Sequence, residues 1–121
     1  MISVKELNEK LKSFDYDLDK LTDEENEVFN KVYELREHKG KLVKHFKGNF
    51  YMIVDFVEHT ETGEELVIYK AMYGNCKKYA RPIDMFISKV DKNKYPDCKQ
   101  DYRFQLIELT LNDDNDDNNE G

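Results

Sequence analysis

Three glycine-containing turn signals divide the middle of the chain into short runs of strand-forming residues. They are Lys47-Gly48-Asn49, Thr62-Gly63 and Gly74-Asn75. Glycine adopts the backbone angles that tight turns need, so each signal predicts a hairpin connection. The runs between them, with one more near the C-terminus, predict five strands at 42–46, 50–59, 65–73, 77–81 and 102–111. Short strands joined by hairpins indicate an α+β protein built on a small SH3-like antiparallel β-barrel.

The central hairpin also permits a prediction of register. If the turn is centred on Thr62-Gly63, Asp55 lies opposite Lys70, and such a pair of opposite charges favours this alignment. Both faces of the hairpin are then apolar, with Ile53, Ile68 and Met72 on the second face. We therefore expect both faces to be covered, the second one by N-terminal helices.

The first 40 residues have helical spacing instead. Ser3 with Glu6, and Thr22 with Glu25, have the spacing of capping boxes at the starts of two helices. Apolar residues follow each box at intervals of three and four, and Gly40 is a suitable stop signal for the second helix. The pattern predicts a helical hairpin with one apolar side, which is typical of intramolecular packing or of contact in a homo-oligomer.

These patterns divide the chain into three parts. Residues 1–40 form the helical hairpin, residues 41–111 form the barrel domain, and residues 112–121 form an acidic tail. The tail contains no apolar residue, so we expect it to be disordered and to contribute nothing to stability.

Charge and composition restrict the function. The net charge of −7 disfavours non-specific binding to nucleic acid. Residues 39–111, however, carry 13 basic and 10 acidic side chains, so this part is able to hold an anionic ligand. No apolar run is long enough to span a bilayer, and the N-terminus lacks the pattern of a signal peptide. We expect a cytoplasmic protein that is not bound to a membrane.

The two cysteines, Cys76 and Cys98, form no CxxC pair and have no histidine at zinc spacing. The sequence therefore predicts no metal site and no cofactor. No P-loop, Rossmann, GxSxG or HExxH motif occurs, so we expect a protein that is not an enzyme.

Arginine is rare in this chain. Among 19 basic residues only Arg36, Arg81 and Arg103 are arginine, and the abundance of lysine and asparagine suggests AT-rich coding in a low-GC bacterium, phage or plasmid. An arginine retained under such a bias is a candidate for bidentate hydrogen bonding or stacking, which lysine does not provide. Arg81 is the best candidate, because Pro82 stiffens the corner on which it stands.

Three segments together resemble a known family. HFKGNFY (45–51), HTETGEELVIYKAMYG (59–74) and YARPIDMF (79–86) are similar to blocks of the bacterial and phage family known as domain of unknown function number 1653. The resemblance covers about residues 41–90 and the final strand. Lys70 and Tyr79 stand where the family usually has an arginine and another aromatic residue. The resemblance implies a fold-sized unit and no particular activity.

The same motifs bring eight polar and aromatic residues to attention as a candidate ligand-binding site. Two interpretations stay open, because these residues either serve turns and corners or form a shared pocket in which tyrosines stack on a ring while arginine and lysine hold an anion. The eight residues are His45, Lys47, Asn49, His59, Glu61, Tyr69, Tyr73 and Arg81.

The function that we expect is the binding of a small anionic, nucleotide-like ligand. A short acidic chain of this kind suits a phage accessory protein, such as a sponge that sequesters a nucleotide signal of host defence. The alternatives are a small barrel that binds RNA or DNA and an adaptor that binds other proteins through its helical hairpin.

Overall fold

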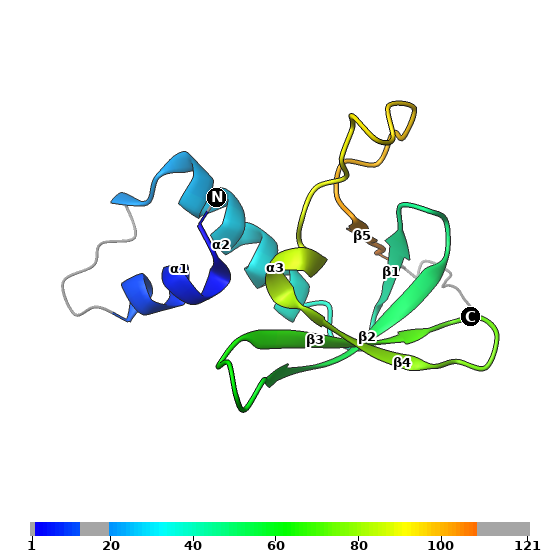
Figure 1. The fold of residues 1–121 in the computed structure, drawn as a ribbon, viewed down its shortest axis with the longest axis horizontal. Helices are drawn as coiled ribbons and strands as arrows, with labels where there is room; N and C mark the ends of the chain where they lie inside the picture. Colours follow the sequence, from blue (N-terminus) through cyan, green and yellow to red (C-terminus); the bar gives the residue numbers. More distant parts are fainter. Residues whose placement is uncertain (1, 13–19, 109–121) are drawn as a thin grey trace, which may run out of the picture.

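The computed structural model describes residues 2–12 and 20–108 of the chain. It contains three helices and five strands, so the predicted mixture of helices and strands is confirmed (Figure 1). In chain order they are α1 (Val4–Leu11), α2 (Asp23–Arg36), β1 (Leu42–His45), β2 (Phe50–Glu58), β3 (Glu65–Ala71), β4 (Lys78–Pro82), α3 (Ile83–Phe86) and β5 (Phe104–Leu106).

The five strands form one antiparallel sheet in the order β4-β3-β2-β1-β5. The edge strands are β4 and β5, and within the described residues no backbone pairing joins them. The sheet is therefore open, and the closed SH3-like barrel expected from the sequence is not confirmed.

Both capping boxes are present. The Ser3 hydroxyl accepts from the backbone N–H of Glu6 at 3.0 Å, and the Glu6 carboxylate accepts from the backbone N–H of Ser3 at 3.0 Å. Thr22 and Glu25 exchange the equivalent bonds at the start of α2. Gly40 lies beyond the end of α2, where its φ of 82° turns the chain and its N–H donates to the carbonyl of Ile53. The helix starts were thus encoded locally.

The predicted register of the central hairpin is wrong. Met52 lies opposite Lys70, and Asp55 lies opposite Ile68. A bulge at Val54 shifts the pairing between Ile53 and Asp55. A bulge adds one residue to one strand, so the residues before it and after it follow opposite alternations. Ile53, before the bulge, therefore shares a face with Tyr69 instead of the predicted face with Ile68. Asp55 instead approaches Lys39, with its Oδ1 3.1 Å from the Lys39 Nζ.

The predicted tight turn at Thr62-Gly63 is a longer loop. The strands are paired as far as Glu58 and Glu65, which leaves residues 59–64 between them. His59 organises this loop, since its backbone N–H donates to the Glu64 carbonyl and its Nδ1 accepts from the backbone N–H of Glu61. The ring of His59 thus contributes to the loop that links β2 to β3.

The core lies between the helices and one face of the sheet. Leu7 of α1 and Leu35 of α2 are buried in the same cluster as Ile53 and Val67 of the sheet. The helices lie toward the end of the sheet that carries the 59–64 loop (Figure 1). The cover that the sequence predicted for Ile53 is present, but Met72 is 47% exposed. The expectation that one helical layer covers both residues is wrong, because it depended on the wrong register.

The short helix α3 covers the sheet near its middle. Its Phe86 is buried, and the ring stacks on Phe104 of β5 with centroids 4.0 Å apart. Phe86 also contacts the ring of Tyr69 on β3, with centroids 5.3 Å apart. The helix α3 therefore packs against both β3 and β5.

Two sequence predictions have no test here. The division of the chain at residue 40 stays a prediction. The acidic tail at 112–121 lies outside the described residues. Of the helices in the described ranges, none has both the length and the apolar character needed to cross a membrane.

Candidate functional site

The inner face of the sheet, on which the core packs, continues beyond the core as a group of aromatic and basic side chains. Directly paired residues of neighbouring strands project from the same face, and so do alternate residues of one strand. The pairs Tyr51–Ala71, Tyr69–Tyr79 and His45–Phe104 therefore share this face with the buried Ile53–Tyr69 pair. We call the following set the tyrosine–arginine cluster: His45, Tyr51, Tyr69, Tyr73, Tyr79, Arg81 and Arg103.

Tyr51 is the centre of the aromatic part. Its ring centroid lies 5.3 Å from Tyr69, 5.7 Å from Tyr73 and 6.4 Å from Tyr79, with interplanar angles between 70° and 80°. The Tyr51 and Tyr73 hydroxyls share a hydrogen bond of 2.9 Å. Burial, and then this hydrogen bond, raise the pKa of Tyr51 to about 12. The rings hold one another in place, while Tyr73 and Tyr79 remain 44% and 41% exposed to a ligand.

Arg81 stands beside these rings on β4. Its Nε donates to the Tyr69 hydroxyl at 3.1 Å, and its guanidinium carbon lies 5.8 Å from the centroid of Phe104. Asp84, the nearest carboxylate along the chain, accepts instead from the backbone N–H of Val4 at 2.7 Å. Within the described part of the chain, no carboxylate pairs with Arg81. The outer nitrogens of its guanidinium are therefore available to an anion.

The pKa of His45 reflects its burial and the positive charges around it. Burial lowers its pKa to about 4, assisted by the positive charges of Arg103, Arg81 and Lys47 in that order. His45 is consequently neutral at pH 7. Its Nδ1 accepts from the backbone N–H of Lys47 at 3.1 Å, so the ring carries its proton on Nε2.

Arg103 precedes β5 and adds a second guanidinium. Its Nε donates to the Ser88 hydroxyl at 3.2 Å, and its backbone N–H donates to the Ser88 carbonyl. No carboxylate pairs with Arg103 among the residues that the structure describes. Two of the three arginines of the chain thus lie near His45 without a carboxylate partner.

The chain segments around the cluster carry charge of one sign. Residues 44–54 and 66–83 contain no aspartate or glutamate, and their charged side chains are Lys44, Lys47, Lys70, Lys77, Lys78 and Arg81. The net negative charge of the whole chain is therefore not the charge of these segments. An anionic ligand would meet a positive field here.

Two of the eight predicted site residues serve the β1–β2 turn. Gly48, with a φ of 112°, donates its N–H to the His45 carbonyl, and the Asn49 carbonyl accepts from the backbone N–H of His45. The side chains of Lys47 and Asn49 are exposed next to the cluster. Their backbones account for the Lys-Gly-Asn motif as turn chemistry.

Two others lie away from the tyrosine rings. His59 and Glu61 are in the loop at the opposite end of the β2–β3 hairpin from Tyr51. From the Tyr51–Ala71 pair to the Glu58–Glu65 pair β2 runs seven residues, roughly 23 Å. Arg81, which pairs with Val67, stands nearer to the loop than Tyr51 does. The structure thus brings together His45, Tyr69, Tyr73 and Arg81, places Lys47 and Asn49 at their margin, and separates His59 and Glu61 from the tyrosine rings.

Tyr51, Tyr79 and Arg103 belong to the cluster but were absent from the prediction. For Tyr79 a signal existed, because it lies two residues before Arg81 on one strand and alternate strand residues share a face. Tyr51 and Arg103 enter through strand pairings that are distant in sequence. In the described ranges, no group of three or more His, Cys, Asp or Glu side chains is placed to hold a metal ion.

Comparison with known proteins agrees with the sequence motifs. Residues 41–106 match the model of a family described as protein of unknown function, DUF1653. Among solved structures, the chain is similar to a crystal structure of a DUF1653 protein from Bordetella bronchiseptica. The identity is 20% and the TM-score is 0.49, over 60% of this chain and 90% of that one. No curated protein is significantly similar to the chain.

Proposed function

The chain belongs to the DUF1653 family, and we propose that it is a non-enzymatic binding protein whose tyrosine–arginine cluster holds a small anionic ligand of the nucleotide class. The observation that carries the proposal is Arg81. Its guanidinium donates to the Tyr69 hydroxyl, lies 5.8 Å from the centroid of the Phe104 ring and pairs with no carboxylate in the described part of the chain.

The ligand class follows from the two kinds of group at the site. A guanidinium binds phosphate or carboxylate oxygens through two parallel N–H bonds, which gives both affinity and orientation. Exposed tyrosine rings, here Tyr73 and Tyr79, offer faces on which a base stacks. A nucleotide combines an anionic group with an aromatic base, so it engages both parts at once.

Binding without catalysis agrees with the state of the one histidine in the cluster. His45 is neutral at pH 7, its Nδ1 is occupied by the Lys47 backbone N–H, and within the described residues no carboxylate orients it. A general base of the usual kind is oriented by a third group. In our proposal His45 therefore donates a hydrogen bond from Nε2 and transfers no proton.

The biological role that we favour is sequestration. A cytoplasmic sponge for a host defence nucleotide, encoded by a phage, needs a binding site, no active site and a small fold. As part of this proposal, the protein forms homo-oligomers through its N-terminal helices and its sheet curves as in a small SH3-like barrel. Native mass spectrometry of the protein, before and after denaturation, measures the oligomer and identifies any co-purified nucleotide.

The decisive test compares two arginines. Arg81→Lys keeps the charge but removes the fork, so binding should weaken by about 1–3 kcal/mol while the melting temperature stays close to that of the wild type. The matched control is Arg36→Lys, because Arg36 pairs with Glu65 and is not part of the cluster. Calorimetric titration with nucleoside mono- and triphosphates and cyclic dinucleotides measures the affinity. A lower melting temperature with unchanged affinity for Arg81→Lys would show that Arg81 is structural.

A further inference from the structure

A second basic and aromatic surface adjoins the cluster. A hollow of about 630 Å³ lies between the end of β1 and the loop at 91–101. Asp97 is the one carboxylate among its lining residues. We call this hollow the lysine hollow, and the residues that matter here are Lys44, Phe46, Lys47, Lys94, Tyr95 and Lys99.

The rings of the lysine hollow are held in fixed positions. The Phe46 and Tyr95 centroids are 4.9 Å apart with an interplanar angle of 66°. The Lys47 Nζ lies 5.9 Å from the Phe46 centroid and 5.8 Å from the Tyr95 centroid, and the Lys94 Nζ lies 5.6 Å from the Tyr95 centroid. Both rings therefore have an ammonium group nearby, as at a site where bases stack and phosphates are neutralised.

The loop that carries Tyr95 is fastened to the sheet. The Gln100 side chain donates to the Lys44 carbonyl at 3.0 Å and to the Tyr102 carbonyl at 2.9 Å. The Lys92 Nζ donates to the Cys98 carbonyl across the base of the loop. The lysine hollow is thus preformed, which lowers the entropic cost of binding.

His45 connects the lysine hollow to the tyrosine–arginine cluster. Its ring stacks on Phe46 with centroids 4.6 Å apart and lies 6.4 Å from the Tyr51 centroid. Tyr79, Tyr51, His45, Phe46 and Tyr95 therefore form one series in which each ring contacts the next. Basic side chains accompany the series from Arg81 to Lys94.

We infer that the protein also binds a single-stranded oligonucleotide, which lies along this series with one nucleotide at the tyrosine–arginine cluster and another at the lysine hollow. The inference rests on the proposed function and extends its ligand from one nucleotide to a short strand. One nucleotide fills only one end of the series and leaves the other end unused. Repeated aromatic faces along a basic groove are how proteins hold single strands, on the order of four nucleotides or more per small β domain. A duplex does not fit this scheme, because its bases are stacked on each other and not available to the rings.

The experiment measures affinity against strand length. Fluorescence anisotropy is recorded with labelled oligothymidylates of two, four, eight and twelve nucleotides, with thymidine monophosphate as competitor and a duplex of twelve base pairs for comparison. We expect affinity to rise at least tenfold from the monophosphate to the eight-nucleotide strand, and the duplex to bind at least tenfold more weakly than that strand. Equal affinity for the monophosphate and every strand, or tighter binding of the duplex, would overturn the inference.

Variants locate the second contact. The double variant Lys94→Gln/Lys99→Gln changes two exposed side chains of the lysine hollow that lie outside the tyrosine–arginine cluster, so the fold should persist. It should weaken the eight-nucleotide strand about tenfold and leave the monophosphate within twofold. The slope of log K against log salt should become shallower by about 1.4, since each phosphate contact on a single strand contributes about 0.7. The matched control is Lys5→Gln/Lys12→Gln on exposed positions at α1. An equal loss in the control would overturn the assignment to the lysine hollow.

The same data separate this inference from the proposed function. If Arg81→Lys weakens monophosphate binding while strand length has no effect, the nucleotide site stands and the oligonucleotide inference fails. If neither the monophosphate nor any strand binds, both fail.

Discussion

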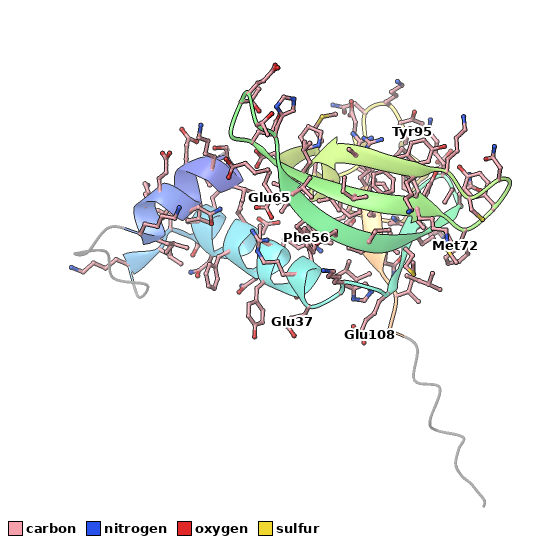
Figure 2. The ribbon with its side chains drawn as sticks, turned by 90° about the horizontal axis from the view of Figure 1, so that it is seen from below. Glu37, Phe56, Glu65, Met72, Tyr95 and Glu108 are labelled. Carbon is pink, nitrogen blue, oxygen red and sulfur yellow. The ribbon has the colours of Figure 1, made fainter. Side chains whose placement is uncertain are left out.

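The helix side and the tyrosine side of the sheet each hold an arginine beside an aromatic ring, but they use it differently. At the end near the helices, Arg36 donates to both carboxylate oxygens of Glu65, at 2.6 and 2.7 Å, and lies over the Phe56 ring. Arg81 stands on β4 opposite Val67, donates to the Tyr69 phenol and has no carboxylate partner within the described residues. In Figure 2 Phe56 and Glu65 lie toward the helices, and Met72 lies at the far end of the sheet.

The difference lies in how the polar groups are paired. Near the helices, polar groups are satisfied inside the protein and apolar ones are buried, so this end contributes to the free energy of unfolding. In the tyrosine–arginine cluster, Tyr73 and Tyr79 are exposed, and the Arg81 guanidinium is held by a phenol. Our proposal of a binding site rests on this second arrangement.

The largest expected effect is on the core at the helix end. Leu35 is 1% exposed, so Leu35→Ala should lower the free energy of unfolding by about 2–5 kcal/mol. Met72 is 47% exposed at the far end, and Met72→Ala should change it by no more than about 0.5 kcal/mol. Denaturant unfolding measures both. Similar losses in the two variants would show that the far end is covered in solution and would break the comparison.

A smaller effect is expected from the ion pair. A double-mutant cycle of Arg36→Ala and Glu65→Ala should give a coupling of about 0.5–1 kcal/mol, because the pair is bidentate but partly exposed. The equivalent cycle of Arg81→Ala and Asp84→Ala should give a coupling below about 0.3 kcal/mol, since Arg81 and Asp84 share no hydrogen bond. Equal couplings would mean that Arg81 is a structural arginine like Arg36.

The pH dependence of stability tests the potential at the far end. The pKa of His45 is lowered in the folded protein from 6.5 to about 4, so the unfolded chain binds the proton more tightly. The stabilising contribution of neutral His45 is present above pH 6.5 and is lost as the pH falls from 6.5 toward 4. His45→Gln, which keeps an acceptor for the Lys47 N–H, should remove this part of the pH dependence. Denaturant unfolding at pH 7.5, 5.5 and 4.5 compares the variant with the wild type, and parallel curves would contradict the assignment.

The smallest effect concerns the phenol pair. Tyr73→Phe removes the hydrogen bond to Tyr51 and should change the free energy of unfolding by about 0.5–1 kcal/mol at most, since Tyr73 is exposed. The pKa of Tyr51 should fall from about 12 but stay above 10, because burial, the larger cause, remains. Ultraviolet titration of the tyrosines follows it. After the loss of the Tyr73 phenol itself is subtracted, an unchanged pKa of Tyr51 would show that the two hydroxyls are not bonded in solution.

Local signals in the sequence predicted local structure correctly. The capping boxes at Ser3 and Thr22 and the turn at Gly48 depend on residues within a few positions of each other, so the chain reveals them without its fold. The register of β2 against β3 was predicted wrongly, because one charge pair does not disclose a bulge at Val54. The charge pair that favoured the wrong register is replaced by Asp55 with Lys39, which lies just after α2.

The site was predicted in part for the same reason. Tyr69 and Tyr73 alternate along one strand, and Arg81 stands at a proline corner, so both signals are local. Tyr51 and Arg103 join them only through the pairings of β2 with β3 and of β1 with β5. His59 and Glu61 belong to the same family motif but lie at the opposite end of the hairpin. A motif that is continuous in sequence is thus divided by a hairpin into two places.

The bulge at Val54 shifts the alternation of inward-facing and outward-facing residues along β2 by one position. Before it the odd-numbered residues Tyr51 and Ile53 face inward, and after it the even-numbered Phe56 does. The aromatic half and the helix-facing half of the strand therefore follow separate frames, and each half can vary without changing the orientation of the other. When relatives are aligned, a strand one residue shorter should have its gap at Val54, and not in the loop at 59–64.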